Sequence, residues 1–220
     1  MYQVNEMFDL NQTNAKDIFE GVTYPWEVLS KIGTFIIEYG KTLSKDEYDE
    51  VEEHVWIAKS ATIAPTAYIH GPAIIGKNTE VRHCAFIRGN AFVGENCVIG
   101  NSTELKNVLI FNSVQVPHYN YVGDSVLGYH SHMGAGSITS NVKSDKTLVT
   151  INTGDEKIET GLKKFGAILG DYVEVGCGSV LNPGSIIGSH TNIYPLSMVR
   201  GMIRANSIYK KQGEVVEKRD

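Results

Sequence analysis

The sequence predicts an all-β solenoid built from short strands stacked in parallel columns. An apolar residue returns at every sixth position over a long stretch, and the same period resumes towards the C-terminus. An α-helix would return its apolar face every three or four residues, and a half-buried strand every second residue. A six-residue period with β-branched anchors instead fits short strands separated by tight turns. Repeats of this length are typical of a parallel β-helix.

The anchors form two uninterrupted series. The first is Ile57, Ile63, Ile69, Ile75, Val81, Ile87, Val93, Ile99, Leu105 and Phe111. The second is Leu169, Val175, Leu181, Ile187, Ile193 and Val199. A small residue follows many anchors, as at Ala58 and Gly76, and repeated turns account for the 22 glycines of the chain. We therefore assign residues 54–203 to the solenoid domain.

Composition restricts the class of protein. The length of 220 residues suits one domain with an appendage, and a net charge of −5 argues against a broad nucleic-acid surface. No apolar run approaches the roughly 18 residues of a membrane span, and residues 1–9 lack a signal-peptide pattern. Cys84, Cys97 and Cys177 are too few and scattered for a disulfide framework. We expect a cytoplasmic protein with no nucleic-acid or membrane partner.

Residues 1–53 lack the six-residue period and predict a helical cap and linker. Pro25 suits the first turn of a helix, with Thr23 as its cap, and we expect a shorter helix over 14–20. The charged stretch 41–53 predicts a solvated connector. Apolar residues recur at helical spacing: Trp26, Leu29, Ile32, Ile36 and Ile37. We interpret this apolar face as packing on the open first coil, and a docking surface for a missing domain is the alternative.

The solenoid pattern is interrupted twice. The frame slips between Asn112 and Tyr121, where the sequence is polar and aromatic, and such a break can aim side chains at a ligand. The second interruption, over 140–165, holds two expected strands, 147–151 and 157–160, around a turn at 152–155. It predicts an inserted hairpin or flap, either a substrate lid or a subunit clasp. Residues 204–220 predict a charged, mobile C-terminal tail.

Several motifs within 88–141 carry a family resemblance. They are Glu104-Leu105-Lys106, His118-Tyr119-Asn120-Tyr121-Val122-Gly123-Asp124, Gly134-Ala135-Gly136-Ser137-Ile138-Thr139 and Asn141. The chain thereby resembles the acetyltransferase half of the bifunctional N-acetylglucosamine-1-phosphate uridylyltransferase/glucosamine-1-phosphate acetyltransferases, which are left-handed β-helix hexapeptide transferases. The runs 24–27 and 160–171 resemble the archaeal-type branch.

The resemblance implies a left-handed coil, a homotrimer with active sites in the grooves between subunits, and acetyl-CoA as co-substrate with no metal. It implies N-acetylation of a hexosamine 1-phosphate, most directly glucosamine 1-phosphate, on the route to a UDP-N-acetylhexosamine. No glycine-rich nucleotide-binding loop precedes the motifs. We therefore expect the nucleotidyltransferase half to be absent and a separate nucleotidyltransferase to complete the product.

The resemblance also assigns catalytic roles. His118 would be the general base, since the unperturbed pKa of histidine, about 6.5, lies near working pH. Glu104 would hydrogen-bond the far nitrogen of that ring and stabilise the imidazolium. The backbone N–H of Ala135 would meet the oxyanion of the tetrahedral intermediate. Without the resemblance these residues would be an ordinary histidine, a solvated carboxylate and a plain turn.

Four further residues would bind the sugar phosphate. Arg88 and Lys106 stand where the family has its phosphate-binding cations, and each alone would be a surface charge. Tyr121 and Asn141 would hydrogen-bond the sugar, and would otherwise be a packing aromatic and a turn residue.

Three positions near the expected acetyl-CoA site depart from the family. His132 replaces an asparagine beside the acyl group, and Cys177 replaces a serine near the cofactor. Pro195 falls where a backbone N–H would meet acetyl-CoA, and proline has none. The flap is also roughly twenty residues longer than in the common bacterial form. The sugar and the acyl donor therefore stay open.

Two other functions fit the scaffold. A zinc enzyme like the left-handed β-helix carbonic anhydrases would use three of His83, His118, His130 and His132, but the ligand pair five residues apart in that class is missing. A catalytically silent, regulatory sugar-phosphate-binding subunit is suggested by the altered cofactor positions and the missing partner domain.

Overall fold

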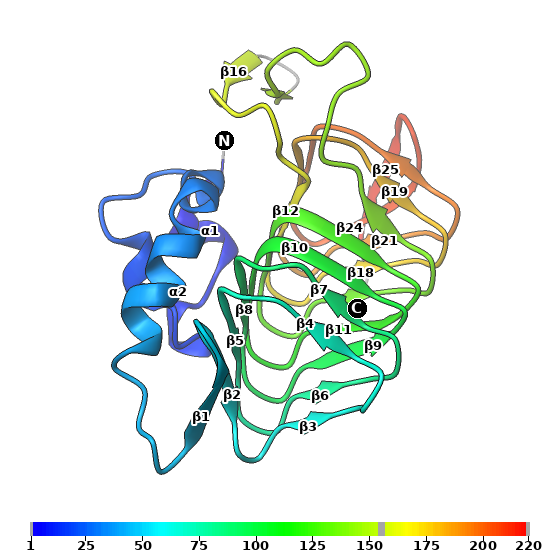
Figure 1. Cartoon of the computed structure of the whole chain (residues 1–220). Coiled ribbons are helices and arrows are strands. Elements are labelled where there is room, and N and C mark those ends of the chain that lie inside the picture. Colours follow the sequence, from blue (N-terminus) through cyan, green and yellow to red (C-terminus); the bar gives the residue numbers. More distant parts are fainter. Residues whose placement is uncertain (1, 154–156, 219–220) are drawn as a thin grey trace.

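The computed structural model describes residues 2–153 and 157–218, and most of them coil into a three-sided β-helix (Figure 1). The first face stacks β2 (Val55–Ala58), β5 (Ala73–Ile75), β8 (Ala91–Val93), the second halves of β10 (Glu104–Ile110) and β12 (Tyr121–Leu127), β17 (Ala167–Leu169), β20 (Ser185–Ile187) and β23 (Met202–Ile203). The second face stacks β3 (Thr62–Ile63), β6 (Glu80–Val81), β9 (Val98–Asn101), β11 (Gln115–His118), β13 (His132–Met133), β18 (Glu174–Val175), β21 (Asn192–Ile193) and β24 (Ser207–Lys211). The third face stacks β4 (Tyr68–Ile69), β7 (Phe86–Ile87), the first halves of β10 and β12, β14 (Ile138–Thr139), β19 (Val180–Leu181) and β22 (Met198–Val199).

The strand pairing confirms the six-residue period. Val55 pairs with Ala73 and Ala73 with Ala91, so one coil takes 18 residues and each of its three sides takes six. The anchors from the second coil onwards are fully buried: Ile75, Val81, Ile87, Val93, Ile99 and Leu105. The fold is therefore the all-β, left-handed parallel β-helix of hexapeptide-repeat proteins.

The frame slip lies earlier than predicted. Val93 pairs with Ile110 and Ile110 with Leu127, each 17 residues on, so one side loses a residue between Leu105 and Ile110. The prediction of a slip after Asn112 was wrong because β10 runs unbroken through a corner of the coil. Asn107 makes this bend in the left-handed conformation, with φ 53°.

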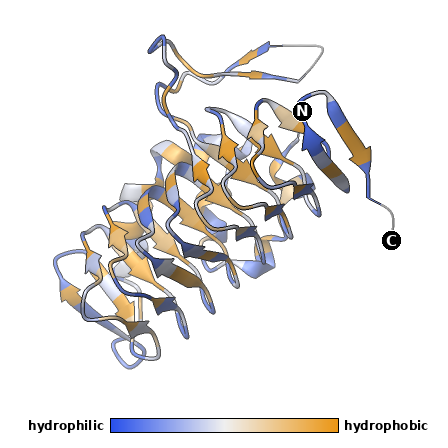
Figure 2. Ribbon diagram, turned by 90° about the vertical axis from the view of Figure 1, so that its right-hand side faces the viewer, coloured by the Kyte–Doolittle hydropathy of each residue, from blue (hydrophilic) through white to orange (hydrophobic). Residues whose placement is uncertain are grey.

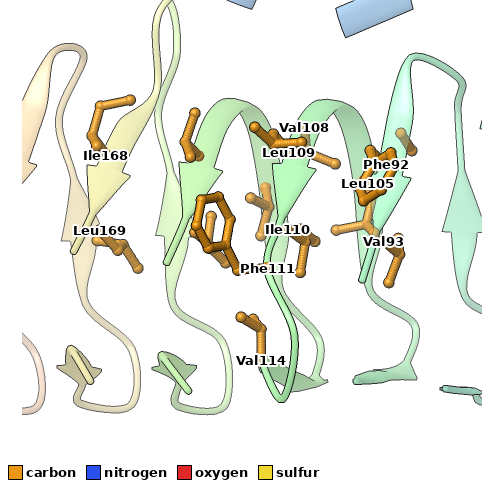
Figure 3. Close-up of a cluster of buried hydrophobic side chains, with 14 of the residues drawn as sticks. Phe92, Val93, Leu105, Val108, Leu109, Ile110, Phe111, Val114, Ile168 and Leu169 are labelled. Carbon is orange, nitrogen blue, oxygen red and sulfur yellow. The ribbon is translucent and has the colours of Figure 1, made fainter. Parts of the chain in front are cut away.

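Phe111, predicted as an inner anchor, is buried outside the column. Its ring packs against Phe8 and Phe19 of the N-terminal segment, with ring centroids 4.9 and 6.0 Å away. Ile110 takes the inner position instead, one residue earlier (Figure 3).

The N-terminal segment differs in detail from the prediction. It contains α1 (Val4–Met7), η1 (Leu10–Gln12), η2 (Lys16–Phe19), η3 (Pro25–Ser30), α2 (Ile32–Gly40) and β1 (Tyr48–Glu52). The helix expected after Pro25 is split into a 3₁₀ turn and an α-helix. Tyr24 rather than Thr23 is the N-cap, and Glu27 accepts both of their N–H groups. The expected connector includes β1, which pairs antiparallel with β2.

The cap covers a side of the solenoid rather than its open end. Helix α2 packs on β5, β8 and β10, and η3 packs on β10 and β12 (Figure 1). The expected contact with the first coil is limited to β1 along β2 and to Gly40 against Trp56. The apolar face after Pro25 instead packs on the first face of later coils, because the outward residues there are themselves apolar and need burial: Ile74, Phe92, Leu109, Val126 and Ile168. A parallel sheet buried on both sides shows adjacent apolar residues, as in Phe92-Val93 (Figure 3).

The predicted hairpin is confirmed over its described part. Strands β15 (Thr150–Asn152) and β16 (Lys157–Glu159) pair antiparallel, and residues 154–156 of the expected turn lie outside the described residues. The flap leaves the corner between the third and first faces (Figure 2), and its buried residues Val149 and Ile151 lie against Gly184 of a later coil.

The C-terminal residues continue the solenoid. β24 pairs with β21, and β25 (Glu214–Glu217) folds back on it. The expected tail is a strand pair through residue 217, because Tyr209 fills the inner column beside Ile193. No described helix has the length and apolar character to cross a membrane.

Candidate active site

The third face brings predicted site residues together on its outer surface. Side chains alternate along a strand, so Leu105 is buried inward while Glu104 and Lys106 point outward. Tyr121 lies beside Glu104 in the next coil. The Arg88 backbone N–H donates to the Leu105 carbonyl at 2.8 Å and so places Arg88 next to Lys106.

Asp124 joins Lys106 and Asn141 in one buried network. Its side chain is only 5% exposed, and Lys106 Nζ lies 2.9 Å from Oδ1 and 3.2 Å from Oδ2. The amides of Asn107 and Asn141 donate to the same carboxylate at 3.0 and 2.5 Å. Because a buried carboxylate must be paired and hydrogen-bonded, these donors hold Asp124 and are held by it in turn.

Tyr121 is connected to this network through Asn141. The Asn141 side-chain amide donates to the Tyr121 hydroxyl at 3.2 Å. A side chain at Gly123 would collide with that hydroxyl, so glycine leaves the space in which the Tyr121 ring folds back. Burial, and then the negative charges of Asp124 and Glu104, raise the pKa of Tyr121, so the hydroxyl stays protonated near neutral pH.

Glu104 pairs with Arg88 rather than with His118. Arg88 Nη1 donates to Glu104 Oε1 at 2.6 Å, and this bond raises the pKa of Arg88. The His118 side chain is exposed at the end of β11, and its ring has no hydrogen-bond partner in the described part of the chain. His118 is three residues before Tyr121, which pairs with Glu104. The two predicted catalytic side chains are thus near in the fold but not joined.

The corner between the second and third faces carries His118 and three of the predicted cofactor residues. His118, Ala135, Cys177 and Pro195 occupy equivalent places in four successive coils, and backbone hydrogen bonds connect the coils there. These bonds are Gly136 N–H to His118 O, Gly178 N–H to Ala135 O and Leu196 N–H to Cys177 O, at 2.8 to 3.0 Å.

Two of these residues differ in what they offer a ligand. Ala135 is exposed, and its backbone N–H has no acceptor among the described residues, so it fits a role as an oxyanion donor. Pro195 has no N–H to offer.

His132 lies apart from this corner, on the second face. Its Nδ1 is 2.8 Å from Glu174 Oε2 on the neighbouring strand. Residues 2–153 and 157–218 contain no group of three or more His, Cys, Asp or Glu side chains placed to hold a metal ion.

Asp124 and Asn107 were not predicted as site residues, although Asp124 lies within the quoted motif. A carboxylate two residues before the apolar pair Val126-Leu127 was the available signal, because an acid at the edge of a buried strand needs partners. Its partners come from two other coils and could not be identified from that signal.

Comparison with known proteins finds similarity to sugar-phosphate acetyltransferases and related domains. The family model of the GMPPB C-terminal domain matches residues 69–203. The bifunctional protein GlmU of Methanococcus maripaludis is 32% identical over 216 residues, which are 96% of this chain and 52% of that protein. A bifunctional sugar-1-phosphate nucleotidylyltransferase/acetyltransferase of Sulfurisphaera tokodaii is 34% identical over 112 residues, 51% of this chain and 28% of that protein. The matched part of this chain therefore spans about half the length of the first relative and about a quarter of the length of the second.

Among solved structures, a hexapeptide transferase family protein from Anaplasma phagocytophilum is similar with a TM-score of 0.42 and 16% identity. The similarity covers 76% of this chain and 81% of that one.

Proposed function

Because the chain belongs to the GMPPB C-terminal domain family and is an acetyltransferase domain of the GlmU-like proteins, we propose that it transfers an acetyl group from acetyl-CoA to the amine of a hexosamine 1-phosphate. Glucosamine 1-phosphate is the substrate we propose first. The observation that carries this proposal is the outer surface of the third face, where two cations, a tyrosine and an asparagine lie within two coils of an exposed histidine.

In the proposed reaction the neutral amine attacks the thioester carbon. A nitrogen–carbon bond forms, the amine proton passes to His118, and collapse of the intermediate breaks the carbon–sulfur bond and releases the thiol, protonated by the imidazolium. The free N–H of Ala135 would stabilise the oxyanion. Glu104 would stabilise the imidazolium once substrate draws Arg88 towards its phosphate.

Arg88 and Lys106 would bind the phosphate. Arg88 uses one N–H group on Glu104 and keeps the rest of its fork for a second anion. The Lys106 side chain is bonded to Asp124 but is still 26% exposed, so a phosphate can reach it from solvent. Tyr121 and Asn141 would bind the sugar ring between these cations and His118.

Acetyl-CoA would lie along the corner that carries Ala135, Cys177 and Pro195, with His132 on the adjoining face. Coenzyme A supplies the activated acetyl group as a thioester. The residues fit in part: Ala135 offers an unpaired N–H, whereas Pro195 contributes only apolar contact.

We further propose a homotrimer in the cytoplasm. Tyr68, Phe86 and Met198 are 58, 40 and 51% exposed on the outside of the third face, and this apolar surface supports association between copies. The cysteines are free thiols, which supports a reducing compartment. A separate nucleotidyltransferase would convert the product to a UDP-N-acetylhexosamine.

The test is release of thiol from acetyl-CoA in the presence of glucosamine 1-phosphate and a panel of other amino sugar phosphates. We expect His118→Ala to lower kcat by about 10² to 10⁴, since this is the usual contribution of a general base. His83→Ala is the matched control, because His83 lies on the same corner two coils away and should leave turnover unchanged.

The second candidate function is a silent sugar-phosphate binder, and one observation favours it: Glu104 is bonded to Arg88 and not to His118. A wild-type protein that binds glucosamine 1-phosphate yet releases no thiol with any amino sugar phosphate would support this candidate. That result would end the acetyl-transfer proposal.

A further inference from the structure

A polar pocket of about 530 Å³ lies between the flap and the last coils of the solenoid. Its walls come from both parts. Ser140, Asn182 and Arg200 belong to the corner where the third face ends, and Lys143 and Lys157 belong to the flap. A volume of this size accommodates a small-molecule ligand.

This pocket adjoins the sugar-phosphate site at Asn141, whose neighbours Ser140 and Val142 line it, but it does not include the phosphate-binding Lys106. Lys106 pairs with Gly123 in the next coil, and Ser140 takes the equivalent place one coil further. Strands of a sheet are about 4.8 Å apart, so the near edge of the pocket is roughly 10 Å from Lys106 along the solenoid axis. None of the residues assigned to acetyl transfer lines it.

The pocket is cationic although the chain is acidic. Its described lining contains Lys143, Lys157 and Arg200 but the single carboxylate Asp145, whereas the whole chain carries −5. Asp145 already accepts the backbone N–H and the hydroxyl of Thr147 and lies 3.4 Å from Lys143 Nζ. These bonds lower the pKa of Asp145, so the carboxylate stays charged and pairs with Lys143.

Among the described residues, two cations of this lining therefore have no anionic partner, one from the solenoid and one from the flap. Neither Arg200 from the solenoid nor Lys157 from β16 makes an ion pair or side-chain hydrogen bond in the described part of the chain. Like charges that line one pocket repel each other, and an anion between them removes that repulsion. The hydroxyls of Ser140 and Ser144 add neutral donors on the same lining.

We propose that this pocket binds a phosphate-bearing ligand of nucleotide size, with Arg200 and Lys157 as its principal contacts. The guanidinium fork of Arg200 matches two phosphate oxygens, and Lys157 supplies a point charge from the flap. Such a ligand would join the flap to the last coils of the solenoid. The phosphates could come from a free nucleotide or from the nucleotide end of coenzyme A, which share this chemistry.

Equilibrium binding to the full chain tests the proposal, with inorganic pyrophosphate, ADP and coenzyme A as separate probes. We expect pyrophosphate and ADP to bind, with affinity falling as salt concentration rises. Arg200→Gln and Lys157→Gln should each weaken binding about tenfold or more, since a charge-assisted hydrogen bond is lost. Lys45→Gln is the matched control, because Lys45 is an exposed lysine near the opposite end of the solenoid.

Two outcomes would overturn the proposal. One is the absence of pyrophosphate and ADP binding to the wild-type chain at millimolar concentration. The other is undiminished binding to the Arg200→Gln/Lys157→Gln double variant, whose fold is checked by circular dichroism. If coenzyme A displaces bound ADP, its nucleotide end is the source of the phosphates, and if it does not, a free nucleotide is. Binding is measured without turnover, so failure of acetyl transfer leaves this test intact.

Discussion

Replacing Asp124 by alanine should destabilise the chain and disorder the sugar-phosphate site together. The carboxylate is the acceptor for Lys106, Asn107 and Asn141, which come from two other corner positions of the solenoid. Alanine would remove the acceptor that these three groups share. The Asn107 amide keeps its bond to the Leu29 carbonyl and the Asn141 amide keeps its bond to the Tyr121 hydroxyl, so the loss falls mainly on the Lys106 ammonium.

The magnitude follows from burial. Removing one partner of a buried ion pair costs about 3–5 kcal/mol. The Asp124 side chain is 5% exposed, but the Lys106 side chain is 26% exposed, so water can replace part of the interaction that the ammonium loses with the carboxylate. We expect the lower end, about 3 kcal/mol, which corresponds to a fall in Tm of about 6–12 °C for a chain of this size.

Urea unfolding and thermal melting measure the loss, and Asp145→Ala is the control. Asp145 also faces a lysine, Lys143, but its side chain is 57% exposed, and solvent screens such a surface pair so that it contributes little to stability. Asp124→Asn keeps an acceptor and should recover part of the stability while kcat/KM for the sugar phosphate stays low. A free energy of unfolding of Asp124→Ala within 1 kcal/mol of wild type would refute the reasoning.

Three other changes test the core, the cysteines and the phosphate contact. Ile75→Ala should cost about 2–5 kcal/mol in urea unfolding, because Ile75 is fully buried; a loss below 1 kcal/mol would contradict a packed column. Burial raises the pKa of Cys97 to about 12, so its thiol is protonated near pH 8. A thiol reagent should therefore label only the exposed Cys84 and Cys177 until urea unfolds the chain, and a third label on the folded chain would contradict this. Arg88→Ala should raise KM for the sugar phosphate about tenfold or more in steady-state kinetics with a smaller change in kcat, and an unchanged KM would place the phosphate elsewhere.

The packing of the cap shows where a local pattern stops being informative. The helical spacing after Pro25 predicted an apolar face, but it did not predict the surface on which that face packs. That partner is the outer side of the first face, where Phe92 and Leu109 are buried under α2 and η3. Ile57 and Ile63 of the first coil, on which the apolar face was expected to pack, stay only partly buried. The adjacent apolar pairs of the first face were in the sequence, and reading only every sixth residue missed them.

The hydrogen-bond partners of the site show the same limit. The motifs placed Arg88, Glu104, Lys106, Tyr121 and Asn141 on one surface, and the structure joins them in bonded groups. The expected bond from Glu104 to His118 is replaced by one to Arg88. A carboxylate takes the nearest donor in space, and spacing along the chain does not specify which donor that is.

The sequence by itself determined the solenoid, its inner column and the inserted hairpin, because each depends on residues within one six-residue side or one turn. Only the tertiary structure decided where the coil shortens, which face the cap buries and what Asp124 holds. Those features depend on which residues face each other across coils 17 or 18 positions apart. Because the side of the coil that contains Asn107 is one residue shorter than the others, all later pairings are shifted, and no local pattern can specify them.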